Sequence, residues 1–477
     1  MRKYKKLLAL LLTVVMTAGL IGCGGGNGTT DSEPQATPAD TGKQTVDSTP
    51  GVASEPVRNL HGMEIIVSRW WDPPSFINNL RQEEWNEYLE EIFTKHNFTW
   101  TDINLTGWGA YLELFTTSTM AQDPAADLYI MSPAWATQLM NQGMLLPLNT
   151  LESIDVFSSK FNQAVIEAFT KDGNVYALPT DAFAEPREFL FFNKRLFAEA
   201  GIDPNEPYEL QARGEWTWDK FMEYCAKLTR DLDNDGIIDV YGFTGSDQAI
   251  INGIVASNMA EFIKRDADGK YYNGMTDPAF IEAINFGKEI RQRGYWAVAP
   301  EGAEWDWGLT TAFIDGHAAM CLYGAYRSEQ YGLNMDDDFG LLFFPKGPKA
   351  TDYNAFFYEN VYVLPFNLDP NEAEDIVFAL NLMTEPLEMD LTYPDYWKDM
   401  HFGYPRFRDA QSVDNTLALF HGGRMTWLNN DSVPGIDWGH YFWDSLGVFG
   451  DEETAQERIE AFAPIVEAAI AEANKNR

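Results

Sequence analysis

Blocks of apolar residues alternate with polar segments along this chain, and their spacing predicts strands and helices in turn. Short apolar runs predict strands at residues 63–67, 126–131 and 189–192. Apolar positions at helical spacing predict helices at residues 83–93, 280–293 and 454–474. Pro464 lies inside the last of these helices, and we expect it to kink that helix or split it in two. Strands and helices therefore follow one another, and we expect an α/β fold.

The stretch of residues 175–201 predicts a connection between two sheets. One apolar run ends at Leu178 before Pro179, which cannot donate to a sheet ladder, and a second run covers residues 189–192. About ten mostly polar residues separate the two runs, which is too few for the helical crossover of a single parallel sheet. We therefore interpret this segment as a hinge over a cleft, with charged side chains between two bodies. Residues 353–365 repeat the pattern, with a polar part followed by a short strand and a proline.

The start of the chain predicts secretion and a lipid anchor. Basic residues at positions 2, 3, 5 and 6 precede an uncharged apolar stretch that is too short to span a membrane, as in a signal peptide. The stretch ends in Leu20-Ile21-Gly22-Cys23, which resembles the bacterial lipobox and implies cleavage before Cys23 and acylation of this residue, for example with palmitate. The signal peptide is assigned to residues 1–22. Residues 23–59 lack large apolar side chains and predict a disordered tether.

The net charge of the chain limits the classes of molecule that it is expected to bind. The formal net charge is −38, which argues against binding to nucleic acid and against docking on anionic lipid. The folded part is longer than the roughly 250–300 residues that one core usually holds, so we expect two lobes. Their limits are set at residues 60–180 with 357–395 for the N-terminal lobe, and 181–356 with 396–477 for the C-terminal lobe.

Several motifs resemble one family. Tyr176-Ala177-Leu178-Pro179, the run from Phe191 to Phe197 and Ala200-Gly201-Ile202-Asp203-Pro204 resemble the first crossover of extracellular solute-binding proteins of family 1, the maltodextrin-binding-protein-like branch of ABC sugar importers. Residues 216–221, 312–326 and 339–348 are also similar to segments of this branch. The resemblance implies a two-lobed, type II periplasmic-binding-protein-like fold, in which each lobe is a mixed sheet flanked by helices. It also implies a second crossover at residues 353–360 and a third near residue 390.

The function that the resemblance implies is solute capture outside the cell. The protein would be a monomeric, lipid-anchored binding protein that closes its lobes on a carbohydrate, an oligosaccharide rather than a monosaccharide, and delivers it to a membrane permease. A secreted glycoside hydrolase with two carboxylates and a scaffold or adhesin lipoprotein stay open as alternatives. The chain has no His pair at helical spacing, no G-x-S-x-G elbow and no P-loop, so zinc proteases, serine hydrolases of that type and P-loop enzymes are unsupported.

The candidate ligand-binding residues combine aromatic rings, which stack on sugar faces, with polar groups that bind hydroxyls. Each tryptophan could instead pack in a core. Tyr326 enters because the resemblance places an aromatic cleft residue there. The candidates are Trp70, Trp71, Asp72, Trp108, Trp135, Asp181, Glu185, Arg187, Trp305, Trp307, Tyr326, Tyr358 and Glu359.

An acidic loop suggests a structural calcium ion. Residues 231–239 repeat the first nine positions of an EF-hand loop, and the expected ligands are Asp231, Asp233, Asp235, the carbonyl of Ile237, and Asp239. Position 12 is Gly242 instead of the usual glutamate, and strand-like residues follow instead of a helix. A lone Ca²⁺ site and a metal-free turn are the two interpretations.

Overall fold

The structure is a computed structural model in which residues 57–72, 80–181, 183–304, 306–393, 395–399, 403–442, 448–450 and 452–476 are described. All of them belong to the compact unit Val57–Arg477, which is separate from the unit Met1–Pro56. The predicted signal peptide, the lipidation site at Cys23 and all but the last residues of the tether lie outside the described residues. Within the described residues, no helix combines the length and the apolar character that crossing a membrane requires.

The first sheet has five strands in the order β2-β1-β3-β14-β6. Its strands are β1 (Met63–Arg69), β2 (Phe98–Asn104), β3 (Leu128–Met131), β6 (Leu178–Pro179) and β14 (Val361–Val363). Strand β1 pairs in parallel with β2 and β3, whereas β14 runs antiparallel to β3 and β6. The sheet is therefore mixed, and one of its inner strands comes from a distant part of the sequence.

Helices cover both faces of this sheet. Alternate residues of β3 enter different cores: Leu128 and Ile130 pack in one, and Tyr129 and Met131 pack in the other, as the two-residue period of a strand requires. The first core also holds side chains of α2 (Leu80–His96) and α12 (Pro370–Met383). The second core holds side chains of α3 (Trp108–Met120) and α4 (Pro133–Asn141).

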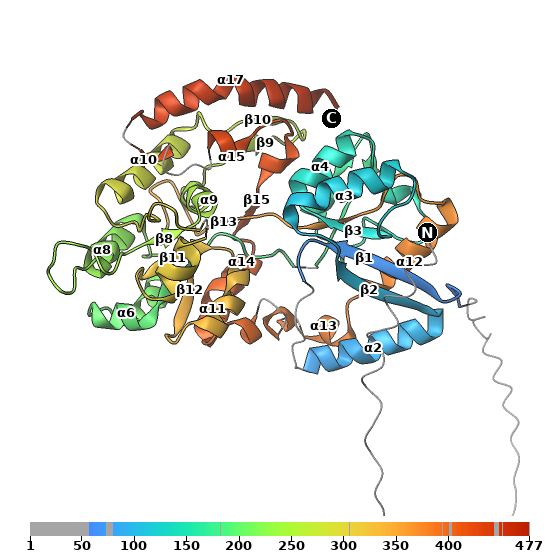
Figure 1. Cartoon of the computed structure of the whole chain (residues 1–477), viewed down its shortest axis with the longest axis horizontal. Helices are drawn as coiled ribbons and strands as arrows, with labels where there is room; N and C mark the ends of the chain where they lie inside the picture. The colour runs from blue at the N-terminus through green and yellow to red at the C-terminus, as the bar shows by residue number, and fades with distance from the viewer. Residues whose placement is uncertain are drawn as a thin grey trace, which may run out of the picture. The chain divides into compact units, whose positions relative to one another are not determined.

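The second sheet has four strands in the order β12-β7-β11-β8. These are β7 (Phe189–Asn193), β8 (Thr244–Gly245), β11 (Met320–Tyr323) and β12 (Phe339–Phe343). Strand β7 is antiparallel to both of its neighbours, and all five of its residues are buried, which explains its continuous apolar run. Helices around it are α6 (Lys194–Glu199), α7 (Glu206–Ala212), α8 (Trp218–Leu228), α9 (Asp247–Ser257), α10 (Pro278–Gln292) and α17 (Ala455–Ala473). Figure 1 shows the two sheets in separate bodies of the unit Val57–Arg477.

In the part of the chain that the structure describes, three segments connect the two bodies. The first runs from β6 to β7, and the second runs from β13 (Ala355–Phe357) to β14. The third follows α12, which packs on the first sheet, and ends before Trp397, which packs in the core of the second. The first two are tied together, because Thr180 Oγ1 donates to the carbonyl of Asn360 at 3.2 Å. The two-lobed, mixed α/β architecture with crossover segments is thus confirmed.

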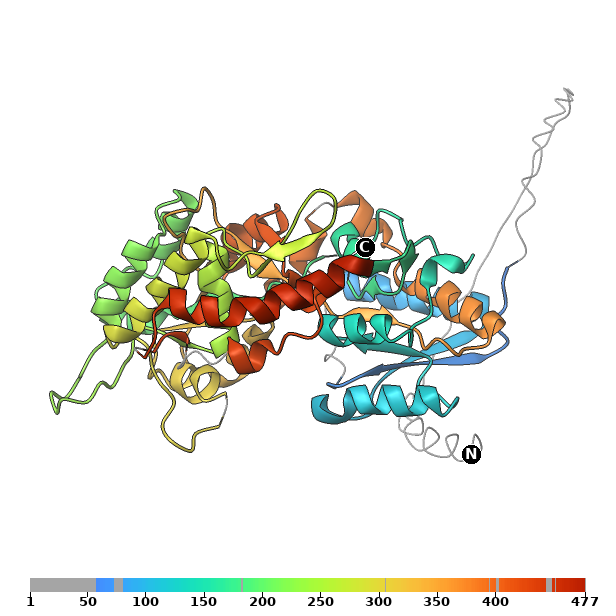
Figure 2. The ribbon, with the colours of Figure 1, turned by 90° about the horizontal axis from the view of Figure 1, so that it is seen from above.

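Two helical and strand predictions differ in detail from the structure. Pro179 is paired within β6 at its last position, next to Val361, rather than lying outside the strand. Helix α17 runs through Pro464 as one element, so this proline does not divide it. A capping box of Thr454 and Glu457 starts the helix, and buried residues on both sides of Pro464 hold it, which offsets the lost hydrogen bond. Figure 2 shows α17 along the outside of the second body.

The remaining elements are short. Residues 395–445 had no clear periodicity. Their described parts, 395–399 and 403–442, form 3-10 and π turns, two helices of four residues each and one strand, β15 (Met425–Trp427), that pairs in parallel with β13. The other short elements are η1 (Leu148–Thr150), α5 (Gln163–Ala168), β4 (Thr170–Lys171), β5 (Asn174–Val175), β9 (Ile263–Arg265), β10 (Tyr271–Asn273), η2 (Gly308–Ala312), η3 (Ala325–Arg327), α11 (Ser328–Asn334), α13 (Glu388–Thr392), η4 (Tyr396–Asp399), η5 (Tyr404–Arg406), η6 (Ser412–Leu417), α14 (Ala418–His421), η7 (Asn429–Ser432), α15 (Trp438–Tyr441) and η8 (Asn474–Asn476).

Candidate functional site

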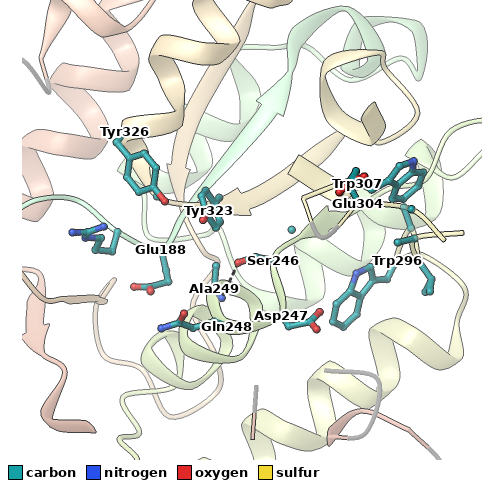
Figure 3. A pocket seen from close by; sticks show the side chains of 18 of the residues that line it. Glu188, Ser246, Asp247, Gln248, Ala249, Trp296, Glu304, Trp307, Tyr323 and Tyr326 are labelled. Atoms are coloured by element: carbon teal, nitrogen blue, oxygen red, sulfur yellow. Dashed lines mark hydrogen bonds between the residues drawn. The ribbon is translucent and has the colours of Figure 1, made fainter. Parts of the chain in front are cut away.

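A cavity of about 500 Å³ lies in the second body, next to the crossovers (Figure 3). Its wall comes from the residues before β7, the turn between β8 and α9, the segment after α10, and the turn after β11. The second crossover adds Tyr358. Strand ends and a helix start therefore meet at one place, which is where α/β sheets usually bind ligands.

Aromatic rings form much of the wall. They are Trp296, Trp307, Tyr323, Tyr326 and Tyr358. The rings of Tyr323 and Tyr326 lie edge to face, with centroids 5.6 Å apart. Gly324 makes this arrangement possible, because a Cβ atom there would come within 2.4 Å of the Tyr326 ring. Each ring offers an apolar face, and the tyrosine hydroxyl and indole N–H groups add polar atoms at the ring edges.

Arg187 is held in place at the junction of the two crossovers. Its guanidinium lies 4.6 Å from the ring centroid of Tyr358 and 5.6 Å from that of Tyr326. It forms an ion pair with Glu185 at 2.5 Å, and its Nε donates to the carbonyl of Tyr358 at 3.3 Å. Burial raises the pKa of Glu185, and the nearby Arg187 opposes that rise. The arginine thus links residues of the first crossover to the second.

Glu188 is a buried carboxyl group in the cavity wall. Its exposed fraction is 2%, and its Oε1 accepts a hydrogen bond from Asn252 Nδ2 at 3.2 Å. Oε2 makes no hydrogen bond of ordinary geometry to any described residue. Burial raises the pKa of Glu188 to about 7, although Asn252, Arg187 and the Tyr358 hydroxyl partly offset the increase. A carboxyl group in this position gains from a donor supplied by a ligand.

The start of α9 supplies further polar groups. Ser246 caps the helix, and its Oγ accepts from the N–H of Ala249 at 3.3 Å. Asp247 and Gln248 follow in the first turn and line the cavity with Glu304. Gly245 precedes them where a Cβ atom would approach the Leu322 carbonyl to 2.6 Å, so only glycine fits between β8 and β11. The turn therefore brings backbone and side-chain polar groups close to the rings.

The predicted tryptophans of the first body gather into one cluster. Trp70 contacts Trp71, Trp108 and Trp135 with ring centroids 4.6–5.2 Å apart, and Trp108 lies 4.0 Å from Trp135. Trp70 follows β1, whereas Trp108 and Trp135 begin α3 and α4. Trp108 is 55% exposed, so the cluster presents a ring to solvent. Asp72 is exposed beside it, and its Oδ1 accepts from Asn104 Nδ2 at 3.0 Å.

Other predicted residues lie around the crossovers without lining the cavity. Asp181 is exposed. Glu359 is 3% exposed, and burial together with the charges of Asp181 and Glu185 raises its pKa well above the usual value. Trp305 lies outside the described residues. Of the predicted ligand-binding residues, the cavity brings together Arg187, Trp307, Tyr326 and Tyr358.

The acidic loop after α8 folds around Asp231. This carboxylate accepts from the N–H groups of Asn234 at 2.7 Å and Gly236 at 2.8 Å. Ligand oxygens of Asp231, Asp233 and Asp239 lie within 4.8 Å of one another, while Asp235 bonds to the N–H of Ile237. The Ile237 side chain is 67% exposed. Calcium binding here stays a prediction.

Gly242 occupies the last loop position for a structural reason. A Cβ atom at this position would lie 2.8 Å from the Cα atom of Cys225 in α8. The backbone after the loop therefore packs against α8 too closely for any side chain, including the glutamate of an EF-hand. The departure from the EF-hand pattern follows from this packing.

Comparison with known families identifies the chain. Residues 78–375, more than half of the sequence, match the model of the bacterial extracellular solute-binding proteins. The chain belongs to this family. No curated protein matches this solute-binding protein in sequence.

Solved structures share its fold at low sequence identity. The cyclic α-maltosyl-1,6-maltose binding protein of Arthrobacter globiformis is 16% identical with a TM-score of 0.61, and the match covers 86% of this chain and 99% of that one. UgpB of Mycobacterium tuberculosis, in complex with glycerophosphocholine, is 17% identical with a TM-score of 0.59 over 85% and 99%. The maltodextrin-binding domain MalE of Bdellovibrio bacteriovorus, bound to maltotriose, is 16% identical with a TM-score of 0.56 over 86% and 100%.

Several cavity residues of this solute-binding protein escaped the sequence analysis. Glu188 was passed over beside Arg187, although it directly precedes the buried strand β7. Trp296 follows α10, and Tyr323 is the last residue of β11. The rule that ligands bind at the ends of strands and helices could therefore have found both residues. Ser246 and Asp247 carry the cap signal of a helix start, which also marks a polar site.

Proposed function

We propose that this protein is the lipid-anchored substrate-binding component of an ABC importer. It captures a carbohydrate, an oligosaccharide, between its two lobes outside the cell and delivers it to a membrane permease. The observation that carries the proposal is the ring-lined cavity, in which carboxylate, amide and hydroxyl groups adjoin aromatic faces beside both crossovers. Sugars need this combination, because their C–H faces stack on rings while their hydroxyls form hydrogen bonds.

The proposed capture mechanism is closure about the crossovers. Arg187 and Tyr358 belong to different crossovers, line the cavity and contact each other. A ligand bound there acts directly on the segments that connect the bodies. The tryptophan cluster around Trp108 supplies a second stacking surface from the first body. Ligand contacts that form with both bodies would shift the population toward a closed state.

The relatives support carbohydrate as the ligand class. The protein from Arthrobacter globiformis is named for a cyclic maltose-based sugar, and the Bdellovibrio domain was solved with maltotriose. UgpB was solved with glycerophosphocholine, so the same fold also accepts a solute that is not an oligosaccharide. The ring-rich wall of the present cavity favours the sugar. The lipid anchor rests on the motif ending at Cys23.

A ligand panel tests the binding function. The mature protein is screened by thermal shift against mono- and oligosaccharides and against glycerophosphodiesters, and hits are measured by calorimetry. A sugar present at 100 times its Kd should add about 2.7 kcal/mol of stability. Recovered sugar should be unaltered, whereas shorter products would favour a glycoside hydrolase. Absence of any sugar response, with a response to another solute, would refute the carbohydrate assignment.

The anchor has a separate test. In cells grown with labelled palmitate, the protein should carry the label and should be found in the membrane fraction. Cys23→Ser should abolish the labelling and the membrane location. Membrane retention of unlabelled Cys23→Ser protein would refute the anchor without affecting the binding function.

A further inference from the structure

The first two crossovers carry more acidic than basic side chains. Residues 180–188 and 358–360 contain one basic residue, Arg187, and four acidic residues, Asp181, Glu185, Glu188 and Glu359. Arg187 pairs with Glu185 at 2.5 Å. Glu359 makes no ion pair with any described residue, so its carboxyl group has no positive charge of its own to offset ionisation.

Glu359 is enclosed where the two crossovers meet. Its neighbours in the chain, Tyr358 and Asn360, are both tied to the first crossover. The carbonyl of Tyr358 accepts from Arg187 Nε at 3.3 Å, and the carbonyl of Asn360 accepts from Thr180 Oγ1 at 3.2 Å. The side chain between these two ties is 3% exposed. Its burial therefore depends on contact between the segments that join the two bodies.

The surroundings of Glu359 favour its neutral form. Neither Oε1 nor Oε2 makes a hydrogen bond of ordinary geometry with any described residue. Burial, followed by the charges of Asp181 and Glu185, raises the pKa of Glu359 well above the ordinary value of 4.5. Arg187 of the first crossover and the neutral amide of Asn162, which precedes α5, oppose this increase only in part. An ionised carboxylate here would lack both water and donors while facing two like charges.

A change in the angle between the bodies would alter these surroundings. The bodies move relative to one another through backbone rotations in the connecting segments. Such rotations change the contact between the crossovers and hence the access of water to Glu359. An arrangement that admits water stabilises the ionised form, whereas the described arrangement stabilises the neutral form. Proton binding and the arrangement of the bodies are therefore linked.

We propose that Glu359 is a proton-dependent switch in the hinge of this protein. With its proton, the side chain stabilises the described arrangement of the crossovers. Loss of the proton favours arrangements in which the crossovers separate around Glu359 and the angle between the bodies changes. Because the described arrangement binds more protons, its population falls as pH rises. The switch acts on the hinge itself and does not depend on which solute the protein binds.

Distances between the bodies test the switch without any ligand. Spin labels attached through Asn86→Cys in α2 and Ala226→Cys in α8 report the separation of the two bodies by pulsed electron paramagnetic resonance (Figure 1). Both positions are exposed, whereas the native Cys225 and Cys321 are fully buried, and Cys23→Ser removes the remaining thiol of the mature protein. Between pH 4.5 and pH 9, the ratio of the two distance populations should change at least about tenfold.

Variants assign the response to Glu359. Glu359→Gln has nearly the same volume and no proton to lose, so at every pH it should show the distances that the parent protein shows at pH 4.5. Asp181→Asn removes an exposed negative charge that raises the pKa of Glu359, so the transition should move to lower pH. Glu301→Gln, which removes an exposed charge elsewhere in the chain, should leave the transition in place.

Three results would overturn the proposal. The first is a distance distribution of the parent protein that does not change with pH. The second is a pH response that survives unchanged in Glu359→Gln, because it would assign the titration to another group, such as Glu185 or Glu188. The third is a transition that stays in place in Asp181→Asn. This exposed substitution decides the question even if Glu359→Gln does not fold, which circular dichroism would show.

Discussion

Replacing Glu188 by glutamine should make the protein more stable at pH 8 and leave its stability at pH 4.5 nearly unchanged. The carboxyl group is 2% exposed, and burial raises its pKa from the ordinary value of 4.5 to about 7. A carboxyl group with a raised pKa binds more protons in the folded state than in the unfolded state between these two values. The free energy of unfolding that it contributes therefore falls as pH rises through this window.

The size of the effect follows from the shift. At about 1.4 kcal/mol per pKa unit, the ionised Glu188 side chain lowers the free energy of unfolding by about 3 kcal/mol at pH 8 relative to pH 4.5. Glutamine at this position has nearly the same shape, carries no charge and can still accept the hydrogen bond from Asn252. The variant should therefore recover about 3 kcal/mol at pH 8.

Urea unfolding at half-unit pH steps from 4.5 to 8 measures this difference directly. Wild type minus Glu188→Gln should fall by about 3 kcal/mol between pH 4.5 and pH 7 and should level off above pH 7. Other carboxyl groups, Glu185 and Glu359 among them, titrate in both proteins and cancel in the difference. Glu301→Gln, which removes an exposed charge, should give a difference that does not vary across this range. The prediction is refuted if the stability of wild type relative to Glu188→Gln does not change with pH, or if it increases as pH rises. Either result would show that Glu188 is not a buried carboxyl group with a raised pKa.

Three further predictions concern other parts of the molecule. Trp108→Ala should weaken sugar binding about tenfold in calorimetry. It should lower the free energy of unfolding by less than about 1 kcal/mol, because the ring is 55% exposed. Unchanged affinity would show that the tryptophan cluster does not contact the sugar. Gly242→Ala should cost about 2 kcal/mol or more in urea unfolding, because its Cβ would lie 2.8 Å from the Cys225 backbone, whereas Gly332→Ala, with open space around it, should be neutral or stabilising. Millimolar Ca²⁺ should raise the Tm of the protein, and Tb³⁺ should become luminescent when it binds to the acidic loop. Asp231→Asn should abolish the rise in Tm and the luminescence. A rise in Tm that survives in the variant would show that the ion binds at another site.

The fold could be predicted further than the site. The assignment of strands to two different sheets followed from local patterns in the sequence. These patterns are buried apolar runs, such as residues 189–192, and polar connectors that are too short to hold a helix. Strand β15 could not be predicted, since its three half-buried residues pair with a segment about seventy residues earlier. Pro464 shows the converse case, in which tertiary packing overrides a local helix-breaking signal.

The site was predicted by residue type more readily than by position. Aromatic and charged residues beside the crossovers were identified, and Arg187 and Tyr358 do meet in the cavity wall. Glu188 was missed because its importance depends on burial beside Asn252, which lies on a helix far along the chain. The sequence contains 72 acidic residues, and composition alone cannot show which of them loses its water on folding.

The position of β14 in the first sheet has a consequence for biosynthesis. This strand, residues 361–363, lies between β3 and β6, whose residues leave the ribosome far earlier. The separation from β14 is 230 residues for the end of β3 and 182 residues for the end of β6, so the first body cannot complete its sheet until most of the polypeptide has been made. Such long-range pairing slows folding and keeps the nascent chain open. An unfinished sheet of this kind suits a polypeptide that must be threaded through a membrane pore before it acquires its final form.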